Sequence, residues 1–193
     1  MSDYRFRGIS LSDRDPALQG GLDLETESGF FAGTWATTIA AYGGAEVEVD
    51  VYAGFASSTG GLDYTATVYA YLYPGGEDVS YVELQATAAR AIGPVTLGVE
   101  ANFVPDQGNV DGENIYLGAS AAAEVPGIGV TARARAGYED GFYDSKWDWE
   151  IGLSYTRGPF TASLSYVDSN FGGPLEEGRL GQSGVVASLI ANF

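Results

Sequence analysis

Hydrophobic and polar residues alternate along most of the chain with a period of two, as in a β-strand, and not with the 3.6-residue period of a helix. The clearest example is residues 46–55, where Val47, Val49 and Val51 alternate with acidic residues. Clusters rich in Gly, Pro, Asn and Asp separate the alternating segments, as turns do. The pattern predicts about twelve strands: Ser2–Ser10, Leu18–Glu25, Phe30–Ala41, 46–55, Leu62–Tyr73, Ser80–Ala89, 95–103, 115–124, 128–135, 147–155, 160–166 and Gly184–Phe193.

The segment Gly184–Phe193 contains no charge and no proline, and it alternates up to an aromatic last residue. Chain ends fray unless something holds them, and a closed barrel does so by pairing its last strand with its first. A terminal phenylalanine also resembles the C-terminal signal of bacterial outer-membrane barrels. We therefore expect Phe193 to be an assembly signal recognised by the barrel-assembly machinery. The last strand of a soluble sheet would fit this segment too.

Three features favour a membrane barrel over a soluble sandwich, which would show the same alternation. The predicted strands reach about 10–12 residues, whereas strands of soluble sheets are usually nearer 5–6. Their apolar faces are rich in alanine, as at Ala119, Ala121 and Ala123, and short turns alternate with longer loops. We therefore predict one domain, residues 1–193, forming an all-β, transmembrane, antiparallel up-and-down β-barrel. Aromatic residues near strand ends are expected to form its interfacial girdles: Tyr4, Phe31, Trp35, Phe55, Phe103, Trp147, Trp149, Phe160 and Phe193.

Composition excludes several classes of function. The chain has 26 acidic and 9 basic residues, and a net charge of -17 argues against nucleic acid as a partner. It has no cysteine and no histidine, which removes thiolate metal ligands and the commonest general base. No apolar run approaches the roughly 18 residues of a transmembrane helix. We expect neither an enzyme nor a bound cofactor.

Turning the apolar faces outward places an excess of acids in the lumen. A barrel of about twelve strands has a backbone diameter of roughly 24 Å, which leaves roughly 10 Å or less between side chains. One inserted loop would plug so narrow a pore, and an acidic wall would concentrate cations. The arginines would either set a field across the pore or pair with Glu124, Asp148 or Glu150. The predicted pore-lining residues are Arg5, Arg7, Asp23, Glu46, Glu48, Asp50, Asp63, Glu83, Glu100, Glu124, Arg133, Arg135, Asp148 and Glu150.

The loop of residues 106–113 carries spaced oxygen ligands that could take Ca²⁺. It departs from the EF-hand pattern and no helices are predicted beside it, so we favour a solvated acidic loop and predict no metal site. At the other end, Met1 leads directly into Ser2 without a signal peptide. We interpret this start as an engineered methionine on a mature or trimmed form of an exported protein.

Three segments, Ser2–Ser10, Pro16–Asp23 and Ser28–Ala36, resemble the TorF-type porin family of Gram-negative bacteria in order and spacing. The resemblance implies a barrel in the bacterial outer membrane, in contact with lipid and lipopolysaccharide, that passes small solutes and has no catalytic residues. Members of that family usually carry several more residues before the first segment, so the first strand would be short here.

Two functions remain open from the sequence. The first is a porin-like channel for passive diffusion of small solutes, with a preference for cations. The second is a non-conducting barrel that acts as a structural anchor, an adhesin or an assembly scaffold. An outer-membrane enzyme is less compatible with the residues, because a chain without histidine lacks the usual Ser-His machinery.

Overall fold

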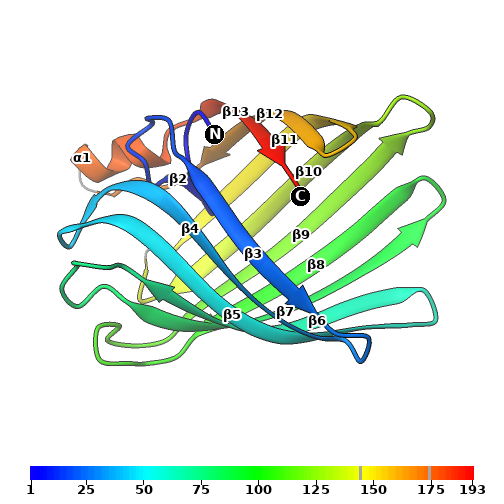
Figure 1. The fold of residues 1–193 in the computed structure, drawn as a ribbon. Coiled ribbons are helices and arrows are strands. Elements are labelled where there is room, and N and C mark those ends of the chain that lie inside the picture. Colours follow the sequence, from blue (N-terminus) through cyan, green and yellow to red (C-terminus); the bar gives the residue numbers. More distant parts are fainter. Residues whose placement is uncertain (144, 174) are drawn as a thin grey trace.

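A computed structural model describes residues 1–143, 145–173 and 175–193 (Figure 1). Eleven antiparallel strands, each paired with its neighbours in chain order from β3 to β13, curl into an up-and-down barrel. The predicted fold class is therefore confirmed. The wall strands are β3 (Gln19–Glu25), β4 (Phe30–Tyr42), β5 (Ala45–Thr59), β6 (Leu62–Leu72), β7 (Tyr81–Ile92), β8 (Val95–Val104), β9 (Asn114–Val125), β10 (Val130–Gly141), β11 (Lys146–Arg157), β12 (Phe160–Ser169) and β13 (Gly184–Ala191).

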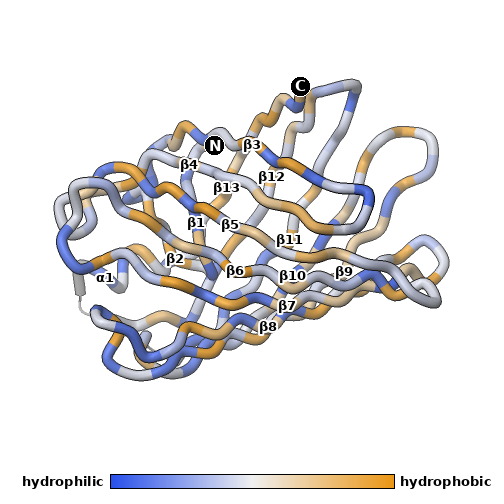
Figure 2. Tube along the Cα trace, turned by 60° about the horizontal axis from the view of Figure 1, so that its bottom comes forward, coloured by the Kyte–Doolittle hydropathy of each residue, from blue (hydrophilic) through white to orange (hydrophobic). Residues whose placement is uncertain are grey.

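The barrel has an apolar exterior and a polar interior. Hydrophobic and hydrophilic positions alternate along the strands (Figure 2), and the side chains of Val51, Leu117 and Ile151 are exposed on the outside. Glu83 and Asp148 point inward from the opposite face of their strands and are buried. This arrangement is the reverse of a soluble domain and is typical of membrane barrels.

The connections differ at the two ends of the barrel. At one end, here called the turn end, tight turns at residues 60–61, 93–94 and 158–159 join the strands. At the other, the loop end, residues 73–80, 105–113 and 170–183 form longer connections (Figure 1). The last of these contains the short helices α1 (Leu175–Gly178) and η1 (Arg179–Gly181), and the turn at 43–44 is the exception. The predicted alternation of turns and loops is thus present.

The first segment does not form a wall strand, so the prediction for Ser2–Ser10 is wrong. It forms a separate two-stranded sheet of β1 (Arg5–Phe6) and β2 (Ile9–Ser10). Arg7 and Gly8 make the turn between them with φ angles of 47° and 83°. Two consecutive positive φ angles are typical of a tight β-hairpin turn. Gly8 adopts its angle at little cost because glycine has no Cβ, whereas Arg7 adopts its angle at some cost in backbone strain.

Met1 and Ser2 lie between the first and last wall strands. The Ser2 amide donates to the carbonyl of Ala187 in β13 at 2.8 Å, and the Ala17 amide donates to the Met1 carbonyl at 2.9 Å. The expected pairing between the two ends of the chain is therefore limited to a contact at Ser2. Past these residues the chain turns into the barrel and returns at Ala17, just before β3.

Candidate functional site: the lumen and its hairpin

The hairpin, defined here as residues 3–12, lies inside the barrel near the loop end. At its base, the Tyr4 hydroxyl donates to Glu48 Oε1 of β5 at 2.7 Å, and the Tyr4 ring lies 5.3 Å from that of Trp35 in β4. At its tip, a Cβ on Gly8 would lie 2.8 Å from the Cβ of Asp148 in β11. The hairpin therefore crosses the lumen from one wall to the opposite wall.

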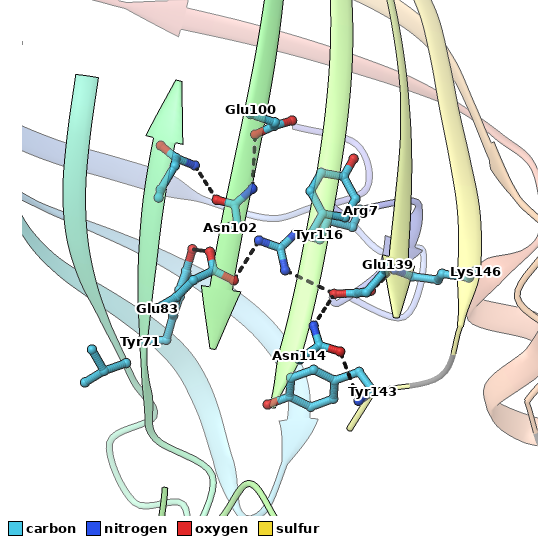
Figure 3. Close-up of polar contacts among 12 residues, drawn as sticks. Arg7, Tyr71, Glu83, Glu100, Asn102, Asn114, Tyr116, Glu139, Tyr143 and Lys146 are labelled. Carbon is cyan, nitrogen blue, oxygen red and sulfur yellow. Dashed lines mark hydrogen bonds and ion pairs between the residues drawn. The ribbon is translucent and has the colours of Figure 1, made fainter. Parts of the chain in front are cut away.

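Arg7 at the hairpin tip lies between two carboxylates of the wall (Figure 3). Its Nη2 donates to Glu83 Oε2 of β7 at 2.7 Å, and its Nη1 donates to Glu139 Oε1 of β10 at 3.1 Å. The guanidinium carbon lies 4.4 Å from the ring centroid of Tyr116 in β9 and 4.5 Å from that of Phe6. We call this set of wall groups, Glu83, Glu139 and Tyr116, the Arg7 cradle.

The charges in the cradle are buried but compensated. The side chains of Arg7, Glu83 and Glu139 are all less than a tenth exposed, and a buried charge is tolerated when it is paired and hydrogen-bonded. Burial lowers the pKa of Arg7, but the charges of Glu83 and Glu139 raise it by more, so the guanidinium remains protonated. Glu139 is further stabilised by Asn114 and Lys146, both of which donate to it.

The base of the hairpin is held by its own polar side chains and by the last loop. Arg5 pairs with Asp3 at 2.6 Å, and Ser10 donates to the same carboxylate at 2.6 Å. Arg5 also donates to the carbonyl of Gln182 at 2.7 Å. Arg5 is therefore part of the hairpin structure and does not line an open wall.

A second ionic network lies on the wall beside the cradle. Arg135 in β10 pairs with Asp148 at 2.9 Å and with Glu100 at 3.8 Å, and it donates to the Tyr116 hydroxyl at 2.6 Å. Arg133 donates to the Ser154 hydroxyl at 3.2 Å. The sequence left two roles open for the arginines, and Arg135 adopts the paired one, with Asp148 as a partner.

The other predicted pore-lining residues fall into two groups. Asp23, Asp63, Glu124, Arg133 and Glu150 follow the inward alternation of their strands and are exposed or half-buried. Glu48 and Asp50 also point inward but are buried, whereas Glu46 is exposed at the start of β5. A pore-lining carboxylate would be solvated, but the hydroxyls of Tyr4 and Tyr73 both donate to Glu48 and cover it.

The aromatic residues predicted to form interfacial girdles divide into an exposed group and an inward-facing group. Trp147, Trp149 and Phe160 are exposed on the outside, as predicted for a girdle, and Phe193 is fully exposed beyond the end of β13. Tyr4 and Trp35 instead contact each other inside the barrel.

Two cradle residues, Glu139 and Tyr116, were not predicted as site residues. The predicted strand 128–135 ends before Glu139, but β10 extends to Gly141, and the inward positions 133, 135 and 137 lead directly to Glu139. Tyr116 was on the polar face of its predicted strand, where a large aromatic among small residues was the available signal.

A cavity of about 630 Å³, here called the vestibule, lies between the hairpin and the loop end. Arg7 and Glu139 are among its lining residues, and much of the remaining lining is aromatic. Tyr81 stacks on Tyr71 of the wall with ring centroids 4.7 Å apart. The aromatic lining residues are Phe6, Tyr42, Tyr73, Tyr81, Phe142, Tyr143 and Phe171.

Within the described ranges, no group of three or more Asp or Glu side chains is arranged to hold a metal ion. The loop considered for calcium is closed by reciprocal backbone hydrogen bonds between Gln107 and Val110. Among the described residues, no helix is both long and apolar enough to cross a membrane.

Comparison with solved structures shows the same fold in the NanC porin, with a TM-score of 0.69 over 92% of this chain and 93% of that chain, at 10% identity. A porin refined at 1.8 Å matches with a TM-score of 0.49 at 11% identity, over 88% of this chain and 60% of that chain. LpxR from Salmonella typhimurium matches with a TM-score of 0.46 at 13% identity, over 92% of this chain and 88% of that chain. The last two scores are too low to support an argument, and the first supports the fold alone.

No curated protein matches the chain. A family model described as a bacterial protein of unknown function matches residues 1–191. The TorF-type family suggested by the N-terminal motifs is not confirmed by these comparisons. The match nevertheless covers nearly the whole chain, so this protein belongs to the bacterial Gcw_chp family of unknown function.

Proposed function

We propose that this protein is an outer-membrane channel for the passive diffusion of small solutes, with a preference for cations, and that the hairpin closes it in the state described here. The observation that carries the proposal is that the hairpin tip crosses a polar lumen and is held there by side chains. Arg7 contacts Glu83 and Glu139 through ion pairs between side chains. These contacts can be exchanged for others without breaking the backbone hydrogen bonds between the wall strands.

The preference for cations follows from the charge of the accessible lumen. Toward the turn end, Asp63 and Glu124 are exposed on inward positions, and Glu150, nearer the middle of the wall, is half-buried. Arg133 is the basic residue that shares this region. At physiological salt the field of a wall charge extends for a Debye length of about 8 Å, comparable to the width of a narrow pore. Cations would therefore be concentrated and anions excluded.

The location and the partners in this proposal rest on the surface of the barrel. Its exterior is apolar along the strands, as contact with a lipid bilayer requires. The fold shared with the NanC porin supports an outer-membrane barrel in general. Lipid, lipopolysaccharide and, through the exposed Phe193, the assembly machinery are the partners that we propose, and we propose no enzymatic activity.

A non-conducting barrel is the second candidate. It is favoured by the way the last loop packs over the hairpin and the two residues that follow it. Arg5 donates to the carbonyl of Gln182 at 2.7 Å, Arg14 donates to the carbonyl of Ser183 at 2.8 Å, and Arg179 forms an ion pair with Asp13. If these contacts keep the hairpin in place permanently, the barrel serves as an anchor or scaffold.

Single-channel recording in planar bilayers distinguishes the two candidates. We expect small or rare conductance steps from the unmodified protein and larger, more frequent steps from Arg7→Ala, which leaves the buried Glu83 without its ion pair and so releases the tip. Arg157→Ala, at the exposed end of β11, is the matched control and should behave like the unmodified protein. If every variant is electrically silent while remaining folded, the channel proposal is wrong and the scaffold remains.

A further inference from the structure

The Arg7 cradle has the shape and chemistry of a guanidinium site. Two carboxylates on different strands bind different nitrogens of one guanidinium, and Tyr116 presents its ring 4.4 Å from the central carbon. A planar guanidinium satisfies this geometry with separate N–H groups, whereas a compact ammonium is a single point charge. The wall therefore presents the contacts that a guanidinium group requires.

The cradle would be strongly attractive to a cation if Arg7 left it. Glu83 is fully buried, and its other contact is the Tyr71 hydroxyl, 3.3 Å away. Glu139 would retain Asn114 and Lys146. One buried negative charge would then lack a counter-ion, and leaving such a charge unpaired is strongly unfavourable.

The vestibule gives a solute a route to the cradle from the loop end. Its volume of about 630 Å³ is within the usual range for small-molecule sites. Arg7 and Glu139 reach its lining, and Tyr73, Tyr81 and Tyr143 supply aromatic surface around them. The space thus offers apolar contacts next to a site for one positive group.

The hairpin tip itself has the composition of the solute that would fit. The Phe6 ring packs against Tyr71 with centroids 5.8 Å apart, and the Arg7 guanidinium stacks on Phe6 at 4.5 Å. Arg7 adopts a φ of 47°, which costs a residue with a side chain some backbone strain. An apolar group joined to a guanidinium could replace both contacts and relieve that strain.

We infer that the Arg7 cradle and the vestibule together form a binding site for organic cations that carry a guanidinium group on an apolar body. Such a solute exchanges with Arg7 and releases the hairpin tip. The inference deepens the proposed channel function and depends on it for the release step, whereas binding itself does not require conduction.

Methylguanidinium is a suitable probe, and Arg7→Ala is the variant to examine, because a tethered Arg7 competes with a free ligand at an effective concentration of the order of millimolar. Calorimetry in detergent should show methylguanidinium binding to Arg7→Ala more tightly than methylammonium does. Adding Glu83→Gln should weaken that binding by roughly tenfold, because the charge-assisted hydrogen bond from the guanidinium to the buried carboxylate becomes a weaker, neutral one. In bilayers, methylguanidinium should reduce the conductance of Arg7→Ala. In Arg157→Ala, which keeps Arg7 in the cradle, methylguanidinium above the millimolar effective concentration of Arg7 should instead make opening more frequent.

Heat-modifiable migration in gels verifies that each variant is folded. If Arg7→Ala fails to fold, Arg7→Gln is used instead, because it keeps much of the side-chain volume without the charge. Absence of methylguanidinium binding in a folded variant, or equal binding of methylammonium, overturns the inference. Binding without any conductance in any variant overturns the channel proposal and leaves the cation site intact.

Discussion

At the scale of single residues, inward-facing glycines make room for the largest lumen side chains. Gly137 in β10 lies against Tyr116, and a Cβ at position 137 would overlap the Tyr116 hydroxyl. Gly33 makes room for Tyr52 in the same way, because a Cβ added at position 33 would lie 2.6 Å from the Tyr52 ring. The missing side chains are thus the reason that tyrosines can lie flat along the wall.

Replacing Gly137 with alanine should displace the Tyr116 ring and thereby weaken its contacts with Arg7 and Arg135. We expect more frequent opening of the channel in planar bilayers, because one wall of the Arg7 cradle is shifted. Gly20→Ala is the matched control, since a Cβ there has no atom within 4 Å. Equal opening of the two variants would show that Tyr116 does not hold the tip.

At the scale of elements, the base of the hairpin depends on protonated tyrosine. Burial, and then the charge of Glu48, raises the pKa of Tyr4 well above its ordinary value of about 10. Burial also raises the pKa of Tyr143, on the loop after β10, to about 12. The closed arrangement therefore binds more protons than an open one does at alkaline pH.

The sign of the pH effect follows from this difference. A released Tyr4 titrates near pH 10 and a docked one only at higher pH, so docking is fully favourable below pH 10 and is lost as the pH rises further. Each pH unit above 10 should favour release by up to about tenfold. The fraction of time that the channel is open, recorded in planar bilayers between pH 9 and 11, measures this release. Tyr4→Phe, which cannot ionise, should remove most of the pH dependence, and an unchanged profile in that variant would disprove the role of Tyr4.

The wall could be predicted from the sequence and the hairpin could not, for a physical reason. In β5, Val47, Val49 and Val51 alternate with acids whichever partner they have, because one face meets lipid and the other the lumen. Tyr4 and Phe6 alternate with charged residues in the same way, but both rings pack against wall aromatics inside the barrel. Alternation indicates two faces and does not identify what each face contacts. The Arg7–Gly8 turn was the one local signal of a hairpin.

At the scale of the whole molecule, the accessible charge of the lumen should set ion selectivity. We expect the open Arg7→Ala channel to prefer K⁺ over Cl⁻ in a KCl gradient. Adding Asp63→Asn, Glu124→Gln and Glu150→Gln should reduce the permeability ratio by roughly twofold or more, because the wall field that attracts cations is weakened. Reversal potentials measure both the preference for K⁺ over Cl⁻ and the change in the permeability ratio.

These three acids are preferable to Glu48 and Asp50 as targets. Both of those are buried, and Glu48 accepts hydrogen bonds from Tyr4 and Tyr73, so changing it would disturb the hairpin as well as the charge. An anion preference in the Arg7→Ala channel, or an unchanged reversal potential in the triple variant, would contradict the acidic lumen as the source of selectivity.

The hairpin lies inside the wall and also precedes it in the chain, and this order has a consequence for folding. The hairpin pairs residues that are close in sequence, such as Phe6 and Ile9. Barrel closure instead brings together Ser2 and Ala187, which lie near opposite ends of the chain. Local hairpins form in roughly 1–10 μs, and contacts between distant residues form far more slowly. We expect the wall to close around a hairpin that has already formed. Sequence changes in the hairpin would then alter the yield of folded barrel as well as the opening of the proposed channel.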